Sequence, residues 1–349
     1  MVFLDKRING ICDEMKKYAV RQRVTVDPIT YKEGFFLRPG DADAAPFLPF
    51  DSAKMHWYGP DRHYWFRAEI TVPESFAGRS LWLHVRTQID EWDDAKNPQF
   101  LLFINDEMVQ GMDMNHREAL LTREARAGER YRVDLQAYTG ILHTEFNLIF
   151  ELREIDPDLD GLYWDLYVPL SAFPRLDPQD TRRMALERVM NDAVNLLDLR
   201  TPYSGAYMDT VRQARAYLQK HLYEELGGHA DIIASCIGHT HIDVAWWWTV
   251  AQTREKVARS FATVLKLMDE YPDYKFMSSQ PQLYAFLKER YPELYARVKE
   301  RVREGRWEPE GGMWLEADCN LTSGESLVRQ FLHGKRFFRE EFGVDNRVL

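Results

Sequence analysis

The chain has 349 residues, which predicts either two domains or one large barrel, since a domain holds roughly 150 residues. Its residues are 45% hydrophobic and 29% charged, as in an ordinary globular protein, which excludes disorder as the main state. The net charge of -10 would repel a phosphate backbone, so we expect no nucleic-acid partner.

The three cysteines, Cys12, Cys236 and Cys319, are odd in number and far apart, so they form neither a disulfide framework nor a CxxC metal clip. No run approaches the roughly 20 apolar residues that span a bilayer, and charged residues begin at Asp5, before the apolar core of a signal peptide could form. We therefore expect a cytoplasmic protein with no membrane partner.

In the first half of the chain, the spacing of apolar residues changes from a helical pattern to a strand-like pattern. Residues 1–34 are predicted to be a helical segment, because Ile8, Ile11 and Met15 recur at helical spacing. Residues 35–155 instead carry short apolar runs separated by turn residues, with a hairpin turn expected at 105–107. The strands are expected at 64–70, 81–85, 100–104 and 146–150. This pattern predicts a β-sandwich of jelly-roll type as an accessory domain.

The second half begins with helical periodicity and then alternates strand and helix. Residues 156–228 are predicted to be a helical connector, and a continuous apolar run over 231–238 predicts a strand buried on both faces of a parallel sheet. Helices are then expected at 254–268, 283–304 and 325–342, and strands at 274–278 and 307–310. This order over 229–349 predicts parallel strands in a barrel or a doubly wound sheet.

Residues 346–349 read as the opening of a further strand. A sheet that stops there would leave an open edge, so we expect the chain to be a fragment whose edge favours a homo-oligomer.

The motif GHTHID at 238–243 follows the buried strand directly, at the end where α/β folds place their ligand sites. In an extended turn His241 and Asp243 point to the same side, so an imidazole nitrogen and a carboxylate oxygen can converge on one metal ion. His239 is a candidate third or supporting group. Isolated histidines are more often simply packed, and amidohydrolase barrels also open with HxH. The HxHxDH pattern of metallo-β-lactamase-type hydrolases is excluded, because Val244 stands where its last His belongs.

Other polar and aromatic residues near the predicted strand ends are candidates for the same pocket. Trp246, three residues beyond Asp243, could present its apolar face to a sugar ring, although tryptophans at a helix start are usually buried. Glu316, Asp318, Gln280 and Gln282 could also line the pocket. The alternative for the two acids is a solvated loop or a helix cap.

Six motifs in order resemble the start of the catalytic domain of glycoside hydrolase family 38, the retaining α-mannosidases. They read GHTHIDVAW at 238–246, SSQPQLY at 278–284, GRWEP at 305–309, GGMW at 311–314, DCN at 318–320 and SGESLVRQF at 323–331. The resemblance covers about 232–349. The upstream β-rich part is similar, with weaker motifs, to the accessory domain of the bacterial and cytosolic branch.

The resemblance implies a seven-stranded β/α barrel, of which 229–349 would be the first half, with one Zn²⁺ per complete active site. His241 and Asp243 match the HxD zinc ligands, and Trp246 matches the tryptophan under the mannose ring, whereas His239 has no ligand role in the family. The family's nucleophilic aspartate lies in a Trp-Leu-Pro-Asp-type motif, which this sequence lacks. We therefore expect no catalytic residue within this chain, an inactive isolated chain, and a mannose-containing oligosaccharide or glycan as the substrate of the whole enzyme.

A second hypothesis makes the β-sandwich a carbohydrate-binding or interaction module. Its aromatic clusters, Trp57-Tyr58 and 64–66, would supply the binding platform. Aromatic clusters of this kind more often form part of a hydrophobic core than a binding platform.

Overall fold

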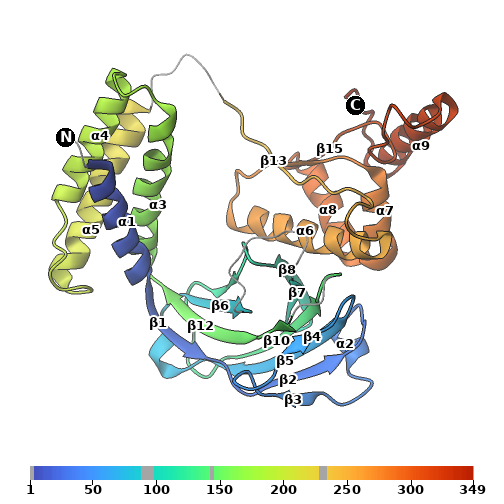
Figure 1. The fold of residues 1–349 in the computed structure, drawn as a ribbon, viewed down its shortest axis with the longest axis horizontal. Coiled ribbons are helices and arrows are strands. Elements are labelled where there is room, and N and C mark those ends of the chain that lie inside the picture. Colours follow the sequence, from blue (N-terminus) through green and yellow to red (C-terminus); the bar gives the residue numbers. More distant parts are fainter. Residues whose placement is uncertain (1–3, 88–97, 142–144, 228–233, 349) are drawn as a thin grey trace.

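The computed structural model describes residues 4–87, 98–141, 145–227 and 234–348. Figure 1 shows three parts: a bundle of helices, a pair of antiparallel β-sheets, and a part in which strands and helices alternate. The expected combination of β and α/β architecture is therefore confirmed. The jelly-roll topology and the completed barrel stay predictions.

Four helices form the bundle, with a π-helical turn, η3, continuing the last one. They are α1 (Leu4–Ala19), α3 (Pro157–Ala172), α4 (Thr181–Asn195), α5 (Gly205–Leu218) and η3 (Gln219–Leu226). The apolar stripe Ile8, Cys12 and Met15 of α1 is buried against these later helices in one core, which confirms the amphipathic N-terminal helix. The predicted connector thus contains a packed bundle that also includes the N-terminus.

Two antiparallel sheets enclose the second core. One sheet has the order β1 (Val20–Thr25), β12 (Ile149–Ile155), β6 (Leu81–Arg86), β9 (Glu118–Thr122). The other has the order β3 (Leu48–Phe50), β2 (Ile29–Glu33), β5 (His63–Thr71), β10 (Arg130–Tyr138), β7 (Gln99–Ile104), β8 (Glu107–Met112). Smaller elements are α2 (Pro39–Ala42), β4 (Trp57–Tyr58), η1 (Glu74–Phe76), β11 (Glu145–Phe146) and η2 (Phe173–Arg175).

The structure differs from the predicted boundary at residue 35. The helix ends at Ala19, and β1 and β2, within the segment expected to be helical, pair with β12 and β5. The strand sequences VRQRVT and ITYKE mix charged and apolar residues, as is usual for strands with one face in solvent. They contain too few apolar residues for the two-residue alternation of a strand to be recognised in the sequence.

The hairpin between β7 and β8 was predicted correctly. Asn105 and Asp106 form its turn with φ values of 50° and 71°. Positive φ at both central residues belongs to a type I′ turn, whose twist matches that of the flanking strands. Asn105 Oδ1 also accepts the backbone N–H of Arg132 at 2.9 Å, so the turn is tied to β10.

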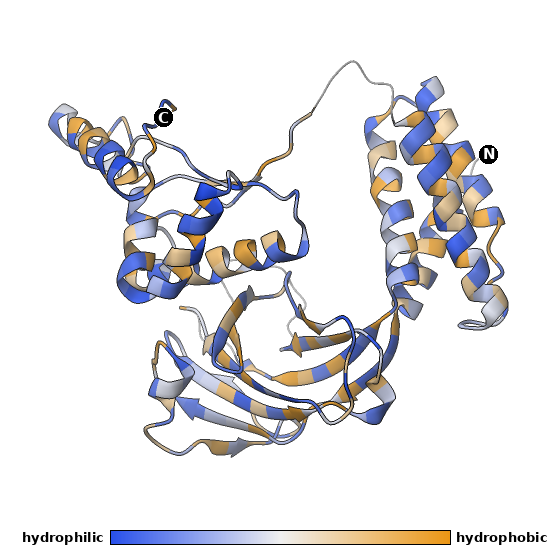
Figure 2. Cartoon of the chain, turned by 180° about the vertical axis from the view of Figure 1, so that it is seen from behind, coloured by the Kyte–Doolittle hydropathy of each residue, from blue (hydrophilic) through white to orange (hydrophobic). Residues whose placement is uncertain are grey.

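Strand β7, and β5 over residues 64–66, are buried on both faces, which explains their continuous apolar runs. Tyr64 and Phe66 point into the core between the sheets, whereas Trp65 points the other way and packs with the β/α part. In β7, Leu101 and Phe103 do the same. Figure 2 shows hydrophobic and hydrophilic residues alternating along much of the remaining sheet.

The β/α part has three parallel strands in the order β13-β14-β15. Its elements are β13 (Gly238–His239), α6 (Val250–Glu270), β14 (Phe276–Ser278), α7 (Pro281–Arg290), α8 (Pro292–Arg303), β15 (Trp307–Pro309) and α9 (Gly324–Phe342). The predicted alternation and parallel pairing are confirmed. The first strand is shorter than predicted: 234–237 form no strand, and 231–233 lie outside the described residues. Residues 343–348 are not a strand either.

Helix α6 joins the β/α part to the sandwich. It lies across β8 and β7 in Figure 1, and its buried residues Val257, Phe261 and Leu265 share a hydrophobic core with Trp65 and Phe103 of the sheet. The sandwich therefore holds α6 in place, and α6 begins directly after residues 240–249, the loop that carries His241 and Asp243 and is called the HxD loop below.

Candidate functional site

The candidate site lies at the carboxyl ends of the three parallel strands. His239 ends β13, Ser279 and Gln280 follow β14, and Glu316 lies in the loop after β15. Because the carboxyl ends of parallel strands meet at one edge of the sheet, side chains far apart in sequence converge here.

His241 and Asp243 lie together, as the sequence predicted they could. Nε2 of His241 is 3.2 Å from Oδ1 of Asp243, and their side chains are 55% and 40% exposed. Two ligands of one tetrahedral zinc ion, each about 2.0 Å from the metal, stand about 3.3 Å apart. The two side chains therefore fit as neighbouring ligands of one cation, with a nitrogen and an oxygen that Zn²⁺ accepts readily.

Within 4–87, 98–141, 145–227 and 234–348, no group of three or more His, Cys, Asp or Glu side chains is arranged to hold a metal ion. The pair thus offers two of the four ligands of a tetrahedral shell. Glu316 does not join them as a third, because its Oε2 lies 3.1 Å from Nδ1 of His241, on the opposite side of the ring from Asp243.

The HxD loop is held by the start of α6. The Thr253 hydroxyl donates to the Val244 carbonyl at 2.6 Å, and the Trp248 indole donates to the Asp243 carbonyl at 3.0 Å. Thr249 caps α6 in a reciprocal capping box with Gln252, so the loop passes directly into a well-formed helix end. These bonds hold the backbone that carries Asp243.

The three consecutive tryptophans have different environments. The Trp248 indole is hydrogen-bonded to the loop, and Nζ of Lys256 lies over its ring, 4.4 Å from the ring centroid. Trp246 and Trp247, in contrast, are 67% and 63% exposed. Trp246 lines a cavity of about 450 Å³ together with His241, and Trp247 does not. The structure thus leaves the indole of Trp246 available beside the HxD pair.

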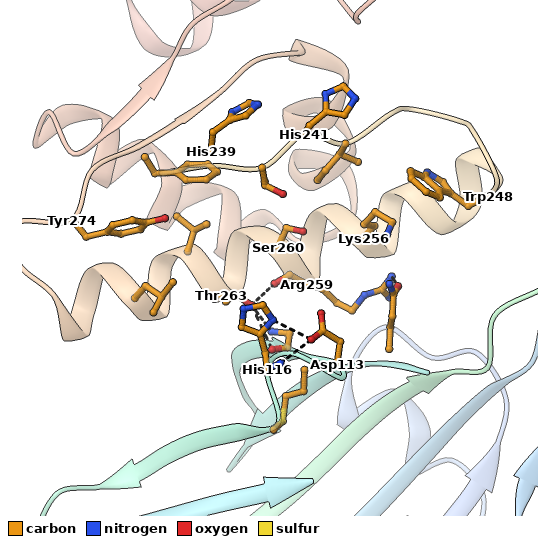
Figure 3. A pocket seen from close by; sticks show the side chains of 18 of the residues that line it. Asp113, His116, His239, His241, Trp248, Lys256, Arg259, Ser260, Thr263 and Tyr274 are labelled. Atoms are coloured by element: carbon orange, nitrogen blue, oxygen red, sulfur yellow. Dashed lines mark hydrogen bonds and ion pairs between the residues drawn. The ribbon is translucent and has the colours of Figure 1, made fainter. Parts of the chain in front are cut away.

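This cavity extends from the HxD loop along α6 to the sandwich, as Figure 3 shows. At its far side are Asp113 and His116, from the loop after β8, whose Oδ1 and Nδ1 lie 3.0 Å apart. That hydrogen bond raises the pKa of His116, and burial opposes the rise. Sequence reasoning missed this pair, because nothing in a sandwich loop signals that it will face a helix 140 residues later.

A second cavity, of about 580 Å³, opens at the other side of the strand ends and is lined by His239, Gln280, Glu316 and Asp318. His239 Nδ1 is bonded to the Met277 carbonyl at 3.0 Å. Asp318 lines the cavity and also accepts the N–H groups of residues 320 and 321, so it is part of a turn as well.

Gln282 stands apart from this group. Its Oε1 accepts the Trp314 indole N–H at 2.9 Å, and it lines neither cavity of the site. Gly311, in the segment after β15, has a φ of 109°.

The aromatic clusters of the sandwich are mostly core. Trp57, Trp65 and Phe66 are at most 1% exposed, and only Tyr58, at 52%, presents a large surface, beside a separate cavity of about 420 Å³. Apart from Tyr58, the clusters therefore pack into the cores and present little exposed surface. None of the helices in the described parts of the chain is long and apolar enough to cross a bilayer. The three cysteines are unpaired.

Fold and site together define a multidomain protein that presents an imidazole, a carboxylate and an indole at the carboxyl ends of parallel β/α strands. Residues 231–349 match the model of the glycosyl hydrolases family 38 N-terminal domain. The β/α part of the chain is therefore similar to this domain.

Named relatives extend the similarity upstream of the matched domain. Alpha-mannosidase G of Dictyostelium discoideum is 30% identical over 93% of this chain and 30% of its own length. Alpha-mannosidase 2C1 of Homo sapiens is 32% identical over 80% of the chain and 27% of its own length. The chain thus spans less than a third of the length of these curated relatives. Among solved structures, a Ruminococcus gnavus β-glucuronidase aligns with 39% of the chain and 29% of its own at 9% identity, with a TM-score of 0.27.

Proposed function

We propose that this protein is part of a zinc-dependent retaining α-mannosidase that hydrolyses terminal α-mannosidic bonds. The observation that carries the proposal is the 3.2 Å separation of His241 Nε2 and Asp243 Oδ1, directly after a parallel strand in the segment that matches family 38. The names of the relatives support the mannosidic substrate.

His241 and Asp243 would hold the zinc ion, which when bound supplies a Lewis acid for substrate oxygens. Their half shell leaves room for the adjacent hydroxyls O2 and O3 of mannose, which are cis in the manno configuration. A sugar that differs at O2 presents those two oxygens differently. The donor pair thereby favours mannosides by positioning.

Trp246 would pack its indole face under the sugar ring, since it is the exposed tryptophan that lines the cavity beside the HxD pair. A broad apolar face suits the C–H groups of a pyranose. Trp248 and Thr253 act on the backbone: they fix the loop from Asp243 to Val244 and so orient the donor carboxylate.

A retaining glycosidase also needs two carboxyl groups about 5–5.5 Å apart, one as nucleophile and one as general acid. We propose that neither comes from these 349 residues, so that the chain alone does not hydrolyse mannosides and the full-length protein does.

The test measures hydrolysis of an aryl α-mannoside and the corresponding α-glucoside by a full-length protein containing this chain. We expect cleavage of the mannoside with retention of the anomeric configuration by NMR, and loss of both zinc and most activity, at least 100-fold, in His241→Ala. His239→Ala is the matched control and should keep its zinc, because His239 bonds a backbone carbonyl. Full zinc content and activity in His241→Ala would refute the proposal.

A further inference from the structure

The His241 ring has a carboxylate beside each of its nitrogens: it is hydrogen-bonded to Asp243 and lies within ion-pair distance of Glu316. Nε2 faces Oδ1 of Asp243 at 3.2 Å, and Nδ1 faces Oε2 of Glu316 at 3.1 Å. A neutral imidazole carries its proton on one nitrogen and a lone pair on the other. Whichever carboxylate receives the N–H therefore decides which nitrogen is available as a donor to a cation.

Glu316 is itself held in place. Its second oxygen, Oε1, accepts the Ser279 hydroxyl at 2.8 Å, and its backbone N–H points to Oε1 of Gln280 at 3.4 Å. The carboxylate is therefore fixed by residues that follow the neighbouring strand, β14. This leaves Oε2 directed at the histidine.

Gln280 extends the same arrangement to the HxD loop. Its side-chain amide donates to the carbonyl of Ile242, the residue between His241 and Asp243, at 2.9 Å. Gln280 is only 3% exposed and has a φ of 64°, a left-handed conformation that a non-glycine residue adopts at a cost. Its backbone position thus serves to place an amide between the loops after β13 and β15.

We infer that Glu316 is a positioning residue for His241: it accepts the Nδ1–H, fixes the tautomer and ring orientation, and leaves the Nε2 lone pair facing the same point as Asp243. Histidines that bind metals commonly donate their other N–H to a carboxylate, which raises the basicity of the ligand. The inference deepens the proposed function and rests on it for the identity of the cation. The 3.1 Å separation of Glu316 Oε2 from Nδ1 is present without any metal.

The competing role for Glu316 is that of a metal ligand. Its oxygen lies beside Nδ1, whereas a ligand sharing the cation of Asp243 would have to lie beside Nε2. The two roles predict different results when the carboxylate is replaced.

The first measurement needs no metal. In the ¹⁵N-labelled 349-residue chain, at a pH chosen so that the ring is neutral, long-range ¹H–¹⁵N NMR shows which nitrogen of His241 carries the proton, and we expect Nδ1. Glu316→Ala should shift the population towards protonation at Nε2, and Glu316→Gln, whose amide oxygen still accepts, should largely retain the Nδ1 proton. An unchanged tautomer in Glu316→Ala would overturn the inference.

The second measurement is the Zn²⁺ affinity of a full-length protein containing this chain, by competition with a chromogenic chelator. We expect Glu316→Ala to weaken binding 10- to 100-fold, as second-sphere carboxylates do, and Glu316→Gln to weaken it less. The spectrum of bound Co²⁺ should keep the same coordination number. Loss of a ligand from that spectrum would overturn the positioning role in favour of direct coordination.

The matched control is Glu325→Gln, which removes one carboxylate near the start of α9 that pairs with Arg329. It should change neither tautomer nor affinity, and circular dichroism should show that all variants are folded. If the wild-type protein binds no zinc through His241, the proposed function fails, while the tautomer experiment still decides whether Glu316 orients the ring.

Discussion

Gly111 of β8 lies directly against Arg259 of α6. A Cβ atom built on Gly111 would stand 2.8 Å from the Cβ of Arg259 and 2.9 Å from its carbonyl oxygen. The Gly111 N–H donates to the Thr263 hydroxyl at 3.0 Å. At this point the backbone of β8 in the sandwich packs directly on α6 of the β/α part, and only glycine leaves enough space for this contact.

We expect Gly111→Ala to destabilise the protein by about 1–3 kcal/mol, because the added methyl group overpacks the contact with α6. Urea denaturation followed by tryptophan fluorescence measures the change. Gly10→Ala is the control, since no atom lies within 4 Å of a Cβ at this exposed position in α1. It should raise the free energy of unfolding by about 0.5–1 kcal/mol through helix propensity. Equal effects at both sites would contradict the tight contact.

The two exposed tryptophans give a matched pair. Trp246→Ala should raise the KM of the full-length enzyme for aryl mannosides about tenfold or more, because it removes an aromatic face beside the HxD pair. Trp247→Ala removes a side chain of similar exposure that does not line the cavity, and it should leave KM unchanged. Thermal unfolding should be nearly the same in both. A KM effect of equal size in both variants would argue against a sugar platform at Trp246.

The Asp113–His116 pair should be visible by its pH dependence. The hydrogen bond that the His116 ring donates to the Asp113 carboxylate raises the pKa of His116 above its ordinary value of 6.5. Because the folded-state value is the higher one, the pair stabilises the fold fully below about pH 6.5, and this contribution is lost as the pH rises through the raised pKa. In Asp113→Asn, NMR titration should find the pKa of His116 nearer 6.5. No change would show that the bond is not formed.

Zinc binding by the 349-residue chain should be weak, since its HxD pair supplies two protein ligands. After dialysis against metal-free buffer, we expect elemental analysis to find well under one zinc per chain. One tightly held ion per chain would mean that further ligands come from these residues or from a second copy.

Self-association of the 349-residue chain is a further expectation. In the sheet β13-β14-β15 both outer strands lack a strand neighbour among the described residues, and unpaired edges favour pairing with another chain. Light scattering should detect species larger than the 41.2 kDa chain. A single monomeric species over a tenfold concentration range would count against it.

Much of the β/α part could be predicted from the sequence, because its signals are local. The run of helices and strands from Val250 to Phe342 follows from apolar periodicity, and the parallel pairing follows from the alternation. The same locality explains the failure at 20–33: β1 and β2 become strands through pairing with β12 and β5, more than 30 residues away in either case.

The site was predictable only in part. The proximity of His241 and Asp243 follows from a spacing of two residues, whereas the contact between Glu316 Oε2 and Nδ1 of His241 joins positions 75 residues apart and depends on two loops. Glu316 and Asp318 were equivalent candidates by sequence. Their roles separate in three dimensions, because Asp318 turns towards its own loop.

The hydrophobic contact of Trp65, Leu101 and Phe103 with α6 has a consequence for dividing this polypeptide. If the chain were cut between the sandwich and the β/α part, the sandwich fragment would expose to solvent the sheet face that now packs on α6. The other fragment would expose the apolar face of α6. Each piece would tend to precipitate before its chemistry could be assayed. The sandwich and the β/α part are better regarded as one folding unit than as two parts that fold independently.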